Sequence, residues 1–334
     1  MTVAQTLNPN RASQSVERRA TRDGFGEGLV LAGEADSQVV VLAADLAGST
    51  RAQAFAERFP DRFVQVGVAE QNLVTVASGL AAAGKRPVAV SYAVFSPGRN
   101  WEQIRTTICY NDQPVVLVGS HAGISVGADG ATHQALEDLA LARVLPNLAV
   151  LSPCDAVEAR KAIQAALRYP APVYLRLTRP PTPVITTDQT PFTFGQALVV
   201  RPGDDVTIIG TGPVLYEALL AADQLHEQGM SARVLNVHTL KPLDTQTVLA
   251  AARETGAIVT VEDHQIVGGL GGAVAEYLAA TWPTPLEFVG MQDQFGQSGS
   301  PDELAAHFGL TAPDIVHAAL RVRRRANRPK GRAA

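Results

Sequence analysis

The sequence predicts an α/β fold with two consecutive domains, each with a largely parallel sheet and flanking helices. Short apolar runs rich in Val and Leu recur between turn residues, and such runs are typical of strands buried on both faces. Helical stretches separate them, and this alternation favours parallel sheets with right-handed crossovers. A proline-rich segment without helical periodicity, residues 179–192, interrupts the pattern, which then starts again. We therefore expect two domains joined by a linker.

The first domain is expected over residues 18–180. Its strands are predicted at residues 39–43, 88–90, 115–118, 148–151 and 173–177, with a strand-like stretch at 63–68. Its helices are predicted at residues 70–83, 100–110 and 155–168. Gly84 is a stop signal for the first of these helices, and Asp155 suits the N-cap of the third.

The linker is expected at residues 181–191, and the second domain at 192–322. Strands are predicted there at residues 206–209, 232–236 and 258–261, and helices at 214–228, 245–255 and 273–281. A glycine-rich turn, residues 268–272, precedes the last helix. Because no Lys-Ser/Thr follows it, we interpret it as a tight turn that lets the helix pack closely. A phosphate-binding loop is the alternative.

Composition and charge exclude several classes of protein. The 334 residues are 46% hydrophobic and 18% charged, as expected of a globular protein with a sizeable core. The net charge is −4, although residues 321–334 hold seven basic residues and no acidic one. The acidic body argues against nucleic acid as the main ligand. Residues 323–334 are expected to form a disordered basic tail.

Cysteine usage and the absence of targeting signals predict a cytoplasmic protein. Cys109 and Cys154 are the only cysteines, which is too few for a zinc ribbon or an iron–sulfur site and suggests a reducing compartment. No apolar run reaches the roughly 18 residues that span a bilayer, and the N-terminus lacks the apolar centre of a secretory signal. No membrane partner is expected.

Residues with chemical potential concentrate in the first domain. Glu70 leads a helix of small and apolar residues, where a carboxylate could also merely complement the helix dipole. Tyr92 and Phe95 follow a predicted strand, where ligands of α/β sheets gather, although single aromatic residues are often core. The glycine-rich stretch 121–134 holds two histidines and an aspartate, a combination that suits proton transfer or oxyanion binding. These residues predict an α/β enzyme with its site at the first sheet.

Seven segments resemble one family. They are ATRDGF (residues 20–25), AADLAGS (43–49), VGVAEQN (66–72), SYAVFSPGRNWEQIR (91–105), SHAGISVGADGATHQALED (120–138), LSPCDAVEA (151–159) and LRLTR (175–179). In this order they resemble the C-terminal half of transketolase, over about residues 18–322. The family's diphosphate-binding domain, with its Gly-Asp-Gly…Asn metal motif, has no counterpart in this sequence. The chain therefore resembles the C-terminal subunit of a split transketolase.

The resemblance implies a thiamine-diphosphate site. Glu70 matches the glutamate that hydrogen-bonds the pyrimidine nitrogen of the cofactor, and burial would raise the pKa of such a carboxyl group. Phe95 matches the ring that stacks on the aminopyrimidine, with Tyr92 beside it. The family usually has Phe at the position of Tyr92, whose hydroxyl needs a polar partner. Asp45 matches a residue on the thiazolium side.

The resemblance also implies a sugar-phosphate site. The residues that match the family's phosphate contacts are Arg22, Ser49, His121 and Arg179. Two guanidinium groups, an imidazole and a hydroxyl make a suitable phosphate cradle. Asp129 matches the residue that reads the C2 hydroxyl of the sugar, and His133 matches one that contacts the donor-derived intermediate. His121 and His133 join Glu70 as the candidate catalytic residues.

The implied reaction moves a two-carbon ketol unit from a ketose phosphate to an aldose phosphate. An N-terminal subunit would hold the diphosphate and a Mg or Ca ion in an α2β2 assembly, and this chain would supply no metal ligand. The alternatives are the β subunit of a 2-oxoacid dehydrogenase, an enzyme like deoxyxylulose-phosphate synthase, and a non-catalytic scaffold subunit. The DGATHQ loop and the two arginines argue against the dehydrogenase, because 2-oxoacids carry no sugar phosphate. Retention of the candidate catalytic residues argues against the scaffold.

Overall fold

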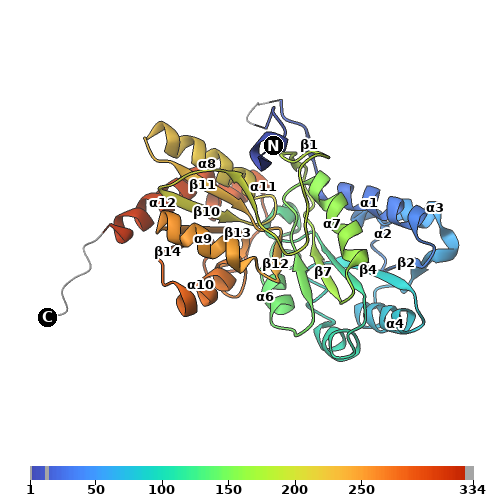
Figure 1. Ribbon diagram of the computed structural model, residues 1–334. Coiled ribbons are helices and arrows are strands. Elements are labelled where there is room, and N and C mark those ends of the chain that lie inside the picture. The colour runs from blue at the N-terminus through green and yellow to red at the C-terminus, as the bar shows by residue number, and fades with distance from the viewer. Residues whose placement is uncertain (1, 12–14, 328–334) are drawn as a thin grey trace.

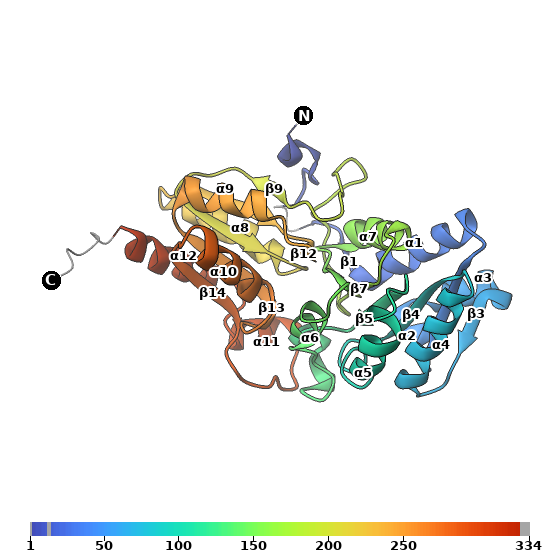
Figure 2. The same cartoon turned by 60° about the horizontal axis from the view of Figure 1, so that its bottom comes forward.

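Two open sheets lie side by side in the structure, a computed structural model in which residues 2–11 and 15–327 are described (Figure 1). The first sheet has seven strands in the order β12-β6-β7-β5-β4-β2-β3. The second has five strands in the order β14-β13-β10-β11-β9. A short antiparallel ribbon of β1 (Arg18–Arg19) and β8 (Thr182–Pro183) lies at the junction of the two sheets (Figure 2).

The first sheet and its helices are built mainly from the first half of the chain. Its strands are β2 (Val39–Ala43), β3 (Phe63–Gln65), β4 (Arg86–Tyr92), β5 (Val116–Ser120), β6 (Ala149–Leu151), β7 (Val173–Arg176) and β12 (Thr239–Lys241). Its helices are α1 (Thr21–Ala35), α2 (Ala47–Thr50), α3 (Gln53–Arg58), α4 (Glu70–Ala82), α5 (Trp101–Gln103), α6 (Asp138–Arg143) and α7 (Ala156–Arg168). Shorter helical turns are η1 (Val3–Thr6), η2 (Pro60–Arg62), η3 (Ile104–Cys109) and η4 (Ile124–Asp129).

The second sheet is built from the second half. Its strands are β9 (Leu198–Arg201), β10 (Val206–Gly210), β11 (Ala232–Asn236), β13 (Ile258–Gln265) and β14 (Leu286–Met291). Its helices are α8 (Leu215–Glu227), α9 (Thr245–Thr255), α10 (Leu270–Thr281), α11 (Pro301–His307) and α12 (Ala312–Ala326). The α/β prediction with largely parallel sheets is confirmed, since every pairing within the two sheets is parallel except those of β9 and β12.

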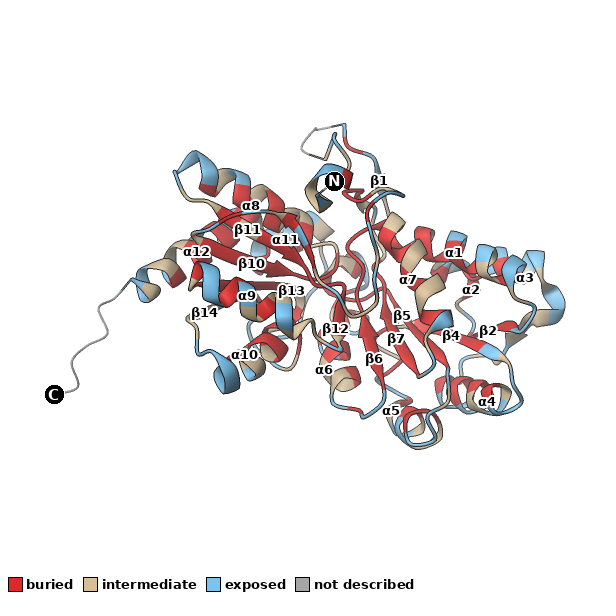
Figure 3. Cartoon of the chain, in the orientation of Figure 1, coloured by how far each residue is buried: buried red, intermediate tan, exposed pale blue. Residues whose placement is uncertain are grey.

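Buried strands between helices form cores that continue from one domain into the other (Figure 3). On one face of the first sheet, α1 and α7 cover β2, β4 and β7. The other face packs against α4 and η3, and this core joins the one beneath α9 and α10 of the second sheet. On the remaining face of the second sheet, α8 and α12 pack together over β10. The two halves therefore share apolar contacts.

Two of the predicted elements in the first domain differ from the structure. The predicted helix at residues 100–110 is a single α-turn, α5, followed by the π-helix η3. The hydroxyls of Thr106 and Thr107 donate to carbonyls four residues earlier, at 3.0 and 2.6 Å, and such side-chain bonds compete with regular helix bonds. The predicted strand at residues 63–68 ends at Gln65, before Gly67, whose φ is +73°.

The prediction of a disordered tail from residue 323 is wrong for its first residues. Helix α12 continues to Ala326 because Val322 is fully buried and the arginines around it have acidic partners. Arg321 and Arg325 lie 3.2 and 2.5 Å from Glu287, and Arg323 lies 3.7 Å from Asp205. The rest of the predicted tail, residues 328–334, lies outside the described residues.

The segment predicted as a linker, residues 181–191, is fixed by strand pairing and by hydrogen bonds to the first domain. Residues 181–191 form no helix, but β8 pairs with β1 at the start of the first domain. Asp155 accepts hydrogen bonds from the backbone N–H groups of Ile185 and Thr186, at 2.8 and 2.6 Å. Lys161 donates to the carbonyls of Thr187 and Thr190.

No described helix is long and apolar enough to cross a membrane.

Candidate active site

The candidate site lies at the edge of the first sheet where β2, β4 and β5 end. Tyr92 is the last residue of β4, and it pairs in parallel with Ser120, the last residue of β5. His121 follows directly in a left-handed conformation, with φ of 59°, and the chain then enters η4. Ligands of open α/β sheets bind outside the carboxyl ends of parallel strands. The topology therefore places these residues where a ligand is expected.

Four predicted side chains meet there in one ring cluster, made of Tyr92, Phe95, His121 and His133. The rings of Tyr92 and His121 stack with centroids 3.9 Å apart, and those of Tyr92 and Phe95 lie 6.1 Å apart. His133 presents its edge to Phe95 at 5.6 Å. Residues far apart in the sequence are thus brought into direct contact.

His121 is held as a neutral acceptor for Arg22. Its Nε2 lies 3.3 Å from Nη1 of Arg22, and its Nδ1 lies 2.9 Å from the hydroxyl of Ser120. Because a guanidinium group can only donate, Nε2 accepts, and Nδ1 carries the proton that is donated to Ser120. Burial, followed by the positive charge of Arg22, lowers the pKa of His121 to about 3. The imidazole is therefore uncharged at neutral pH.

We expect the ring resonances of His121 to stay unchanged from about pH 8 to about pH 5 in the folded chain, whereas a free histidine titrates at about 6.5. Because the folded pKa is depressed, this group costs stability as the pH falls from its unfolded value towards about 3. An NMR titration measures the effect, with a His121→Gln variant to assign the signal and the denatured chain as control. An inflection near the ordinary value in the folded chain would contradict the assignment.

Arg22 and Arg179 both line a cavity of about 470 Å³ between η4 and the start of α11, which we call the two-arginine cavity. Arg22 donates from Nη1 to the backbone carbonyl of Ser49 at 2.6 Å, and its buried Nε has no partner among the described residues. Burial, and next the charge of Arg51, lowers the pKa of Arg22. An excess of positive charge around an unpaired donor suits an anionic ligand.

Asp129 and Arg179 form a pair at the mouth of this region. Nη1 of Arg179 donates to the carbonyl of Val126 at 2.9 Å and lies 3.3 Å from the carboxylate of Asp129. Both side chains are partly exposed, at 41% and 35%. A surface pair of this kind contributes little stability. Both groups can therefore turn to a ligand at small cost.

Glu70 lies at the start of α4 and is 4% exposed. Its carboxylate makes no hydrogen bond among the described residues, and its ion-pair partner there is Nε of Arg99, at 3.9 Å. Asn100 donates from Nδ2 to the backbone carbonyl of Glu70 at 3.0 Å, and to the hydroxyl of Ser96 at 3.2 Å. Since Ser96 follows Phe95 directly, these bonds fix the start of α4 beside the ring cluster. A carboxylate that makes no hydrogen bond within the described residues keeps its acceptor capacity for a ligand.

Two predicted site residues make no contact with the ring cluster through their side chains. Asp45 is exposed, and only its backbone N–H is engaged, with Oε1 of Gln65 at 2.7 Å. The hydroxyl of Ser49 donates to the carbonyl of Leu46 at 3.1 Å, so only the carbonyl of Ser49 touches Arg22. Asp45 and Ser49 remain predictions as ligand contacts.

Sequence reasoning missed two residues that organise the site, Asn100 and Gln134. Gln134 is buried, and its Nε2 donates to the carbonyls of Ile124 and Gln297, at 3.1 and 3.0 Å. It thereby fixes η4 against a loop of the second domain. In both residues the buried Oδ1 or Oε1 atom has no partner among the described residues. The signal in the sequence for Gln134 was its position next to the candidate His133, and Asn100 followed no candidate residue directly.

The glycine-rich turn at residues 268–272 is a packing device, as predicted. The carboxylate of Glu262 accepts from the backbone N–H groups of Leu270 and Gly271, at 2.7 and 2.8 Å. A Cβ atom at Gly269 would lie 1.9 Å from that carboxylate. The start of α10 is thus already occupied by a buried acid, which leaves no room there for a phosphate.

Comparison with family models assigns both halves of the chain. Residues 17–184 match the transketolase pyrimidine-binding domain, and residues 195–315 match the transketolase C-terminal domain. The chain belongs to the transketolase family. The family uses thiamine diphosphate, as the resemblance in the sequence predicted.

Similar proteins narrow the assignment to transketolases made of two chains. The chain is 42% identical to the 6-deoxy-6-sulfo-D-fructose transketolase subunit SqwH of Clostridium sp. (strain MSTE9), over 93% of this chain and 97% of that protein. It is 37% identical to one subunit of the apulose-4-phosphate transketolase of Phocaeicola vulgatus, over 90% and 96%. A solved structure described as a split gene transketolase, inactive beta4 tetramer, superposes with a TM-score of 0.86 at 44% identity, over 91% and 98%. This chain is a C-terminal subunit of the split type.

Proposed function

We propose that this chain, together with an N-terminal transketolase subunit, transfers a two-carbon ketol unit from a ketose phosphate to an aldose phosphate. The observation that carries the proposal is the pairing of two features at one sheet edge. The buried residue Glu70, whose carboxylate makes no hydrogen bond within residues 2–11 and 15–327, lies near the ring cluster, and two arginines line a cavity close by. The first feature suits a nitrogen heterocycle, and the second suits a phosphate.

The residues present fit the aminopyrimidine part of thiamine diphosphate. Glu70, a buried residue at the start of α4, would hydrogen-bond a ring nitrogen through its carboxyl group. Phe95 would stack on the ring, with Tyr92 supporting it through its stacked face. Asp45 would approach the thiazolium side. When bound, thiamine diphosphate supplies the nucleophilic carbon to which the ketol unit is transferred.

The two-arginine cavity would hold the phosphate of the sugar. Arg22 and Arg179 would supply guanidinium donors, with Ser49 and His121 beside them. Asp129 would accept from the C2 hydroxyl of the sugar after leaving Arg179. His133 is half-buried and presents its ring edge to Phe95, so it would donate to the reacting end of the substrate.

A partner subunit would complete the site. Within residues 2–11 and 15–327, no group of three or more His, Cys, Asp or Glu side chains is placed to hold a metal ion. The diphosphate and its Mg or Ca ion would therefore be bound by the N-terminal subunit, in an α2β2 assembly in the cytoplasm. The related structure of a split transketolase is described as an inactive β4 tetramer, which supports inactivity of this chain alone.

The test is ketol transfer from xylulose 5-phosphate to ribose 5-phosphate, measured with this chain, the N-terminal subunit, thiamine diphosphate and Mg²⁺. Activity that requires both chains is expected. Decarboxylation of a 2-oxoacid without ketol transfer would assign the chain to the dehydrogenases instead. Absence of both activities in a stable complex of the two chains would favour the scaffold alternative.

Replacing Arg179 by Ala should raise the KM for a phosphorylated donor about tenfold or more, because a charge-assisted hydrogen bond to phosphate is lost. The kinetics with a ketose that carries no phosphate should hardly change. Arg168→Ala on the exposed side of α7 is the matched control. An equal loss with both kinds of donor would place Arg179 outside the phosphate site.

A further inference from the structure

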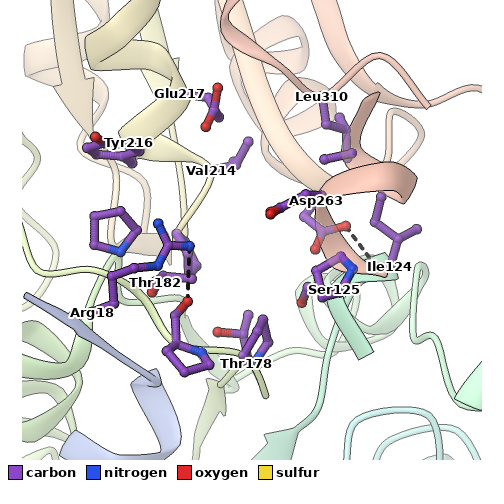
Figure 4. A pocket seen from close by; sticks show the side chains of 17 residues that line it. Arg18, Ile124, Ser125, Thr178, Thr182, Val214, Tyr216, Glu217, Asp263 and Leu310 are labelled. Atoms are coloured by element: carbon purple, nitrogen blue, oxygen red, sulfur yellow. Dashed lines mark hydrogen bonds between the residues drawn. The ribbon is translucent and has the colours of Figure 1, made fainter. Parts of the chain in front are cut away.

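A second cavity of about 470 Å³, which we call the interdomain cavity, lies between the two domains (Figure 4). Its walls come from the β1–β8 ribbon, the first residues of η4, the end of β13, the start of α8, and α11. Its volume falls in the range of about 300–1,000 Å³ that is usual for small-molecule sites. Neither the ring cluster nor the two arginines line it.

The cavity opens at the topological switch point of the second sheet. Strand β10 lies between β11 and β13, so the chain leaves β10 to one side and later returns to its other side. Pro213 and Val214, which follow β10, and Asp263, near the end of β13, line the cavity, and Figure 4 shows Val214 and Asp263 on its walls. Crevices at such switch points are the usual ligand sites of open α/β sheets.

Charge around the cavity is predominantly negative. Glu217, Asp263 and Asp302 line it, whereas Arg18 is its only lining cation among the described residues. Burial raises the pKa of Glu217 and of Asp263, whereas the charges of Arg18 and Arg176, respectively, lower it. Arg18 itself donates to the carbonyl of Pro181 at 3.3 Å, so part of its hydrogen-bonding capacity is used.

Two of these carboxylates are fixed by hydrogen bonds to the first residues of helices. They thereby occupy the positions where an anion would bind. Glu217 accepts from the N–H of Ala312, at the start of α12, at 2.9 Å. Asp263 accepts from the N–H of Ile124, at the start of η4, at 3.0 Å. Helix N-termini are where an anion would bind, and both are already covered by an acid. The remaining walls combine apolar residues, including Val214 and Leu310, with the hydroxyl-bearing residues Ser125, Thr178, Thr182 and Tyr216.

We propose that the interdomain cavity is a regulatory site for a small organic cation, an amine or guanidine with an apolar body. The apolar part of the walls would take the body, and Glu217 and Asp302, which both line the cavity, would take the charge. The site would act on the sugar-phosphate site through shared walls. Ser125, Pro180, Pro181 and Pro301 line both this cavity and the two-arginine cavity. A ligand in the interdomain cavity would therefore contact residues that flank Arg179 in the two-arginine cavity.

Binding is tested on the full chain alone by calorimetry, with benzylamine as the cationic probe. Benzyl alcohol and benzoate serve as neutral and anionic probes of nearly the same shape. We expect benzylamine to bind and the other two not to bind measurably. Glu217→Gln keeps the acceptor for Ala312 while removing the charge, so benzylamine affinity should fall about tenfold. Glu227→Gln, exposed at the far end of α8, should leave affinity unchanged.

Several results would overturn this assignment. They are an absence of benzylamine binding in the millimolar range, equal binding of benzyl alcohol, preferred binding of benzoate, or unchanged affinity in Glu217→Gln. Retained thermal stability of Glu217→Gln shows that a loss of binding is not a loss of folding.

The regulatory role of the interdomain cavity rests on the proposed function. It is tested separately from binding, by the kinetics of the two-chain enzyme. In the two-chain enzyme, benzylamine should change the KM for the phosphorylated donor at least threefold in the wild type and not in Glu217→Gln. An unchanged KM with benzylamine bound would overturn regulation while leaving the binding site. If the two chains show no ketol transfer, the proposed function fails, and the binding experiment still decides the site.

Discussion

Replacing Glu70 by Ala is expected to lower ketol transfer by the two-chain enzyme by about a hundredfold or more, the upper part of the usual range for a lost proton-transfer partner. Glu70 is a buried residue, and its carboxylate makes no hydrogen bond among the described residues, which leaves it to the cofactor. Steady-state kinetics at saturating thiamine diphosphate and Mg²⁺ measure the loss.

The Glu70→Gln variant separates two contributions of Glu70 to activity, its proton and the space that it fills. The amide fills the same space but cannot supply the carboxyl proton. It should be nearly as inactive as the alanine variant. Both should melt close to the wild type, since the carboxylate makes no hydrogen bond in the described part of the chain. Exposed Glu57 on α3 gives the matched control, Glu57→Ala. More than a tenth of wild-type activity in Glu70→Gln would refute the role.

Replacing Asp138 by Ala should destabilise the chain by about 3–5 kcal/mol, the usual cost of leaving a buried charge unpaired. Asp138 accepts from Nε of Arg176 at 2.9 Å and from the hydroxyl of Tyr174 at 2.9 Å, and all three side chains are buried. Although burial opposes the charged form, Asp138 raises the pKa of Arg176 above its ordinary value. The same guanidinium donates to the carbonyl of Asp263 at 2.8 Å and so ties the two domains together.

Urea unfolding followed by circular dichroism measures this loss. The matched control is Asp223→Ala, which removes a surface ion pair with Arg201 and should cost no more than about 1 kcal/mol. Equal effects of the two variants would mean that the buried pair contributes no more than the exposed one.

The strands were readable in the sequence because parallel strands covered on both faces must be almost wholly apolar, as β2 is. Helix α1 could not be predicted from the sequence, because it contains four glycines, which lower helix propensity. Two of those glycines, Gly24 and Gly28, allow close contact with α7, and the other two face Arg51 and the rings of Phe55 and Phe59. A Cβ atom at Gly24 would lie 1.7 Å from the carbonyl oxygen of Ala156, and one at Gly28 would lie 2.7 Å from that of Arg160. Close packing of distant helices overrides propensity and leaves no local signal.

Some features of the candidate site could be predicted from the sequence, and others depend on contacts between distant residues. Tyr92 and His121 could be placed together from the sequence, since each follows a parallel strand of the same sheet. The neutral state of His121 could not be predicted from the sequence, because it depends on burial and on Arg22, 99 positions away. The interdomain cavity was equally unreadable, since its walls come from elements spread over nearly the whole chain.

Strand β12 has a consequence for synthesis. It pairs with β6 at the edge of the first sheet, although more than 60 residues of other structure separate them in the chain. The first sheet therefore stays one strand short until Lys241 has left the ribosome, and β6 meanwhile presents an open edge. A fragment that stops at the proline-rich segment would keep that edge permanently. The boundary suggested by the prolines is thus a poor place to cut the subunit, and soluble expression of its first domain requires a longer fragment.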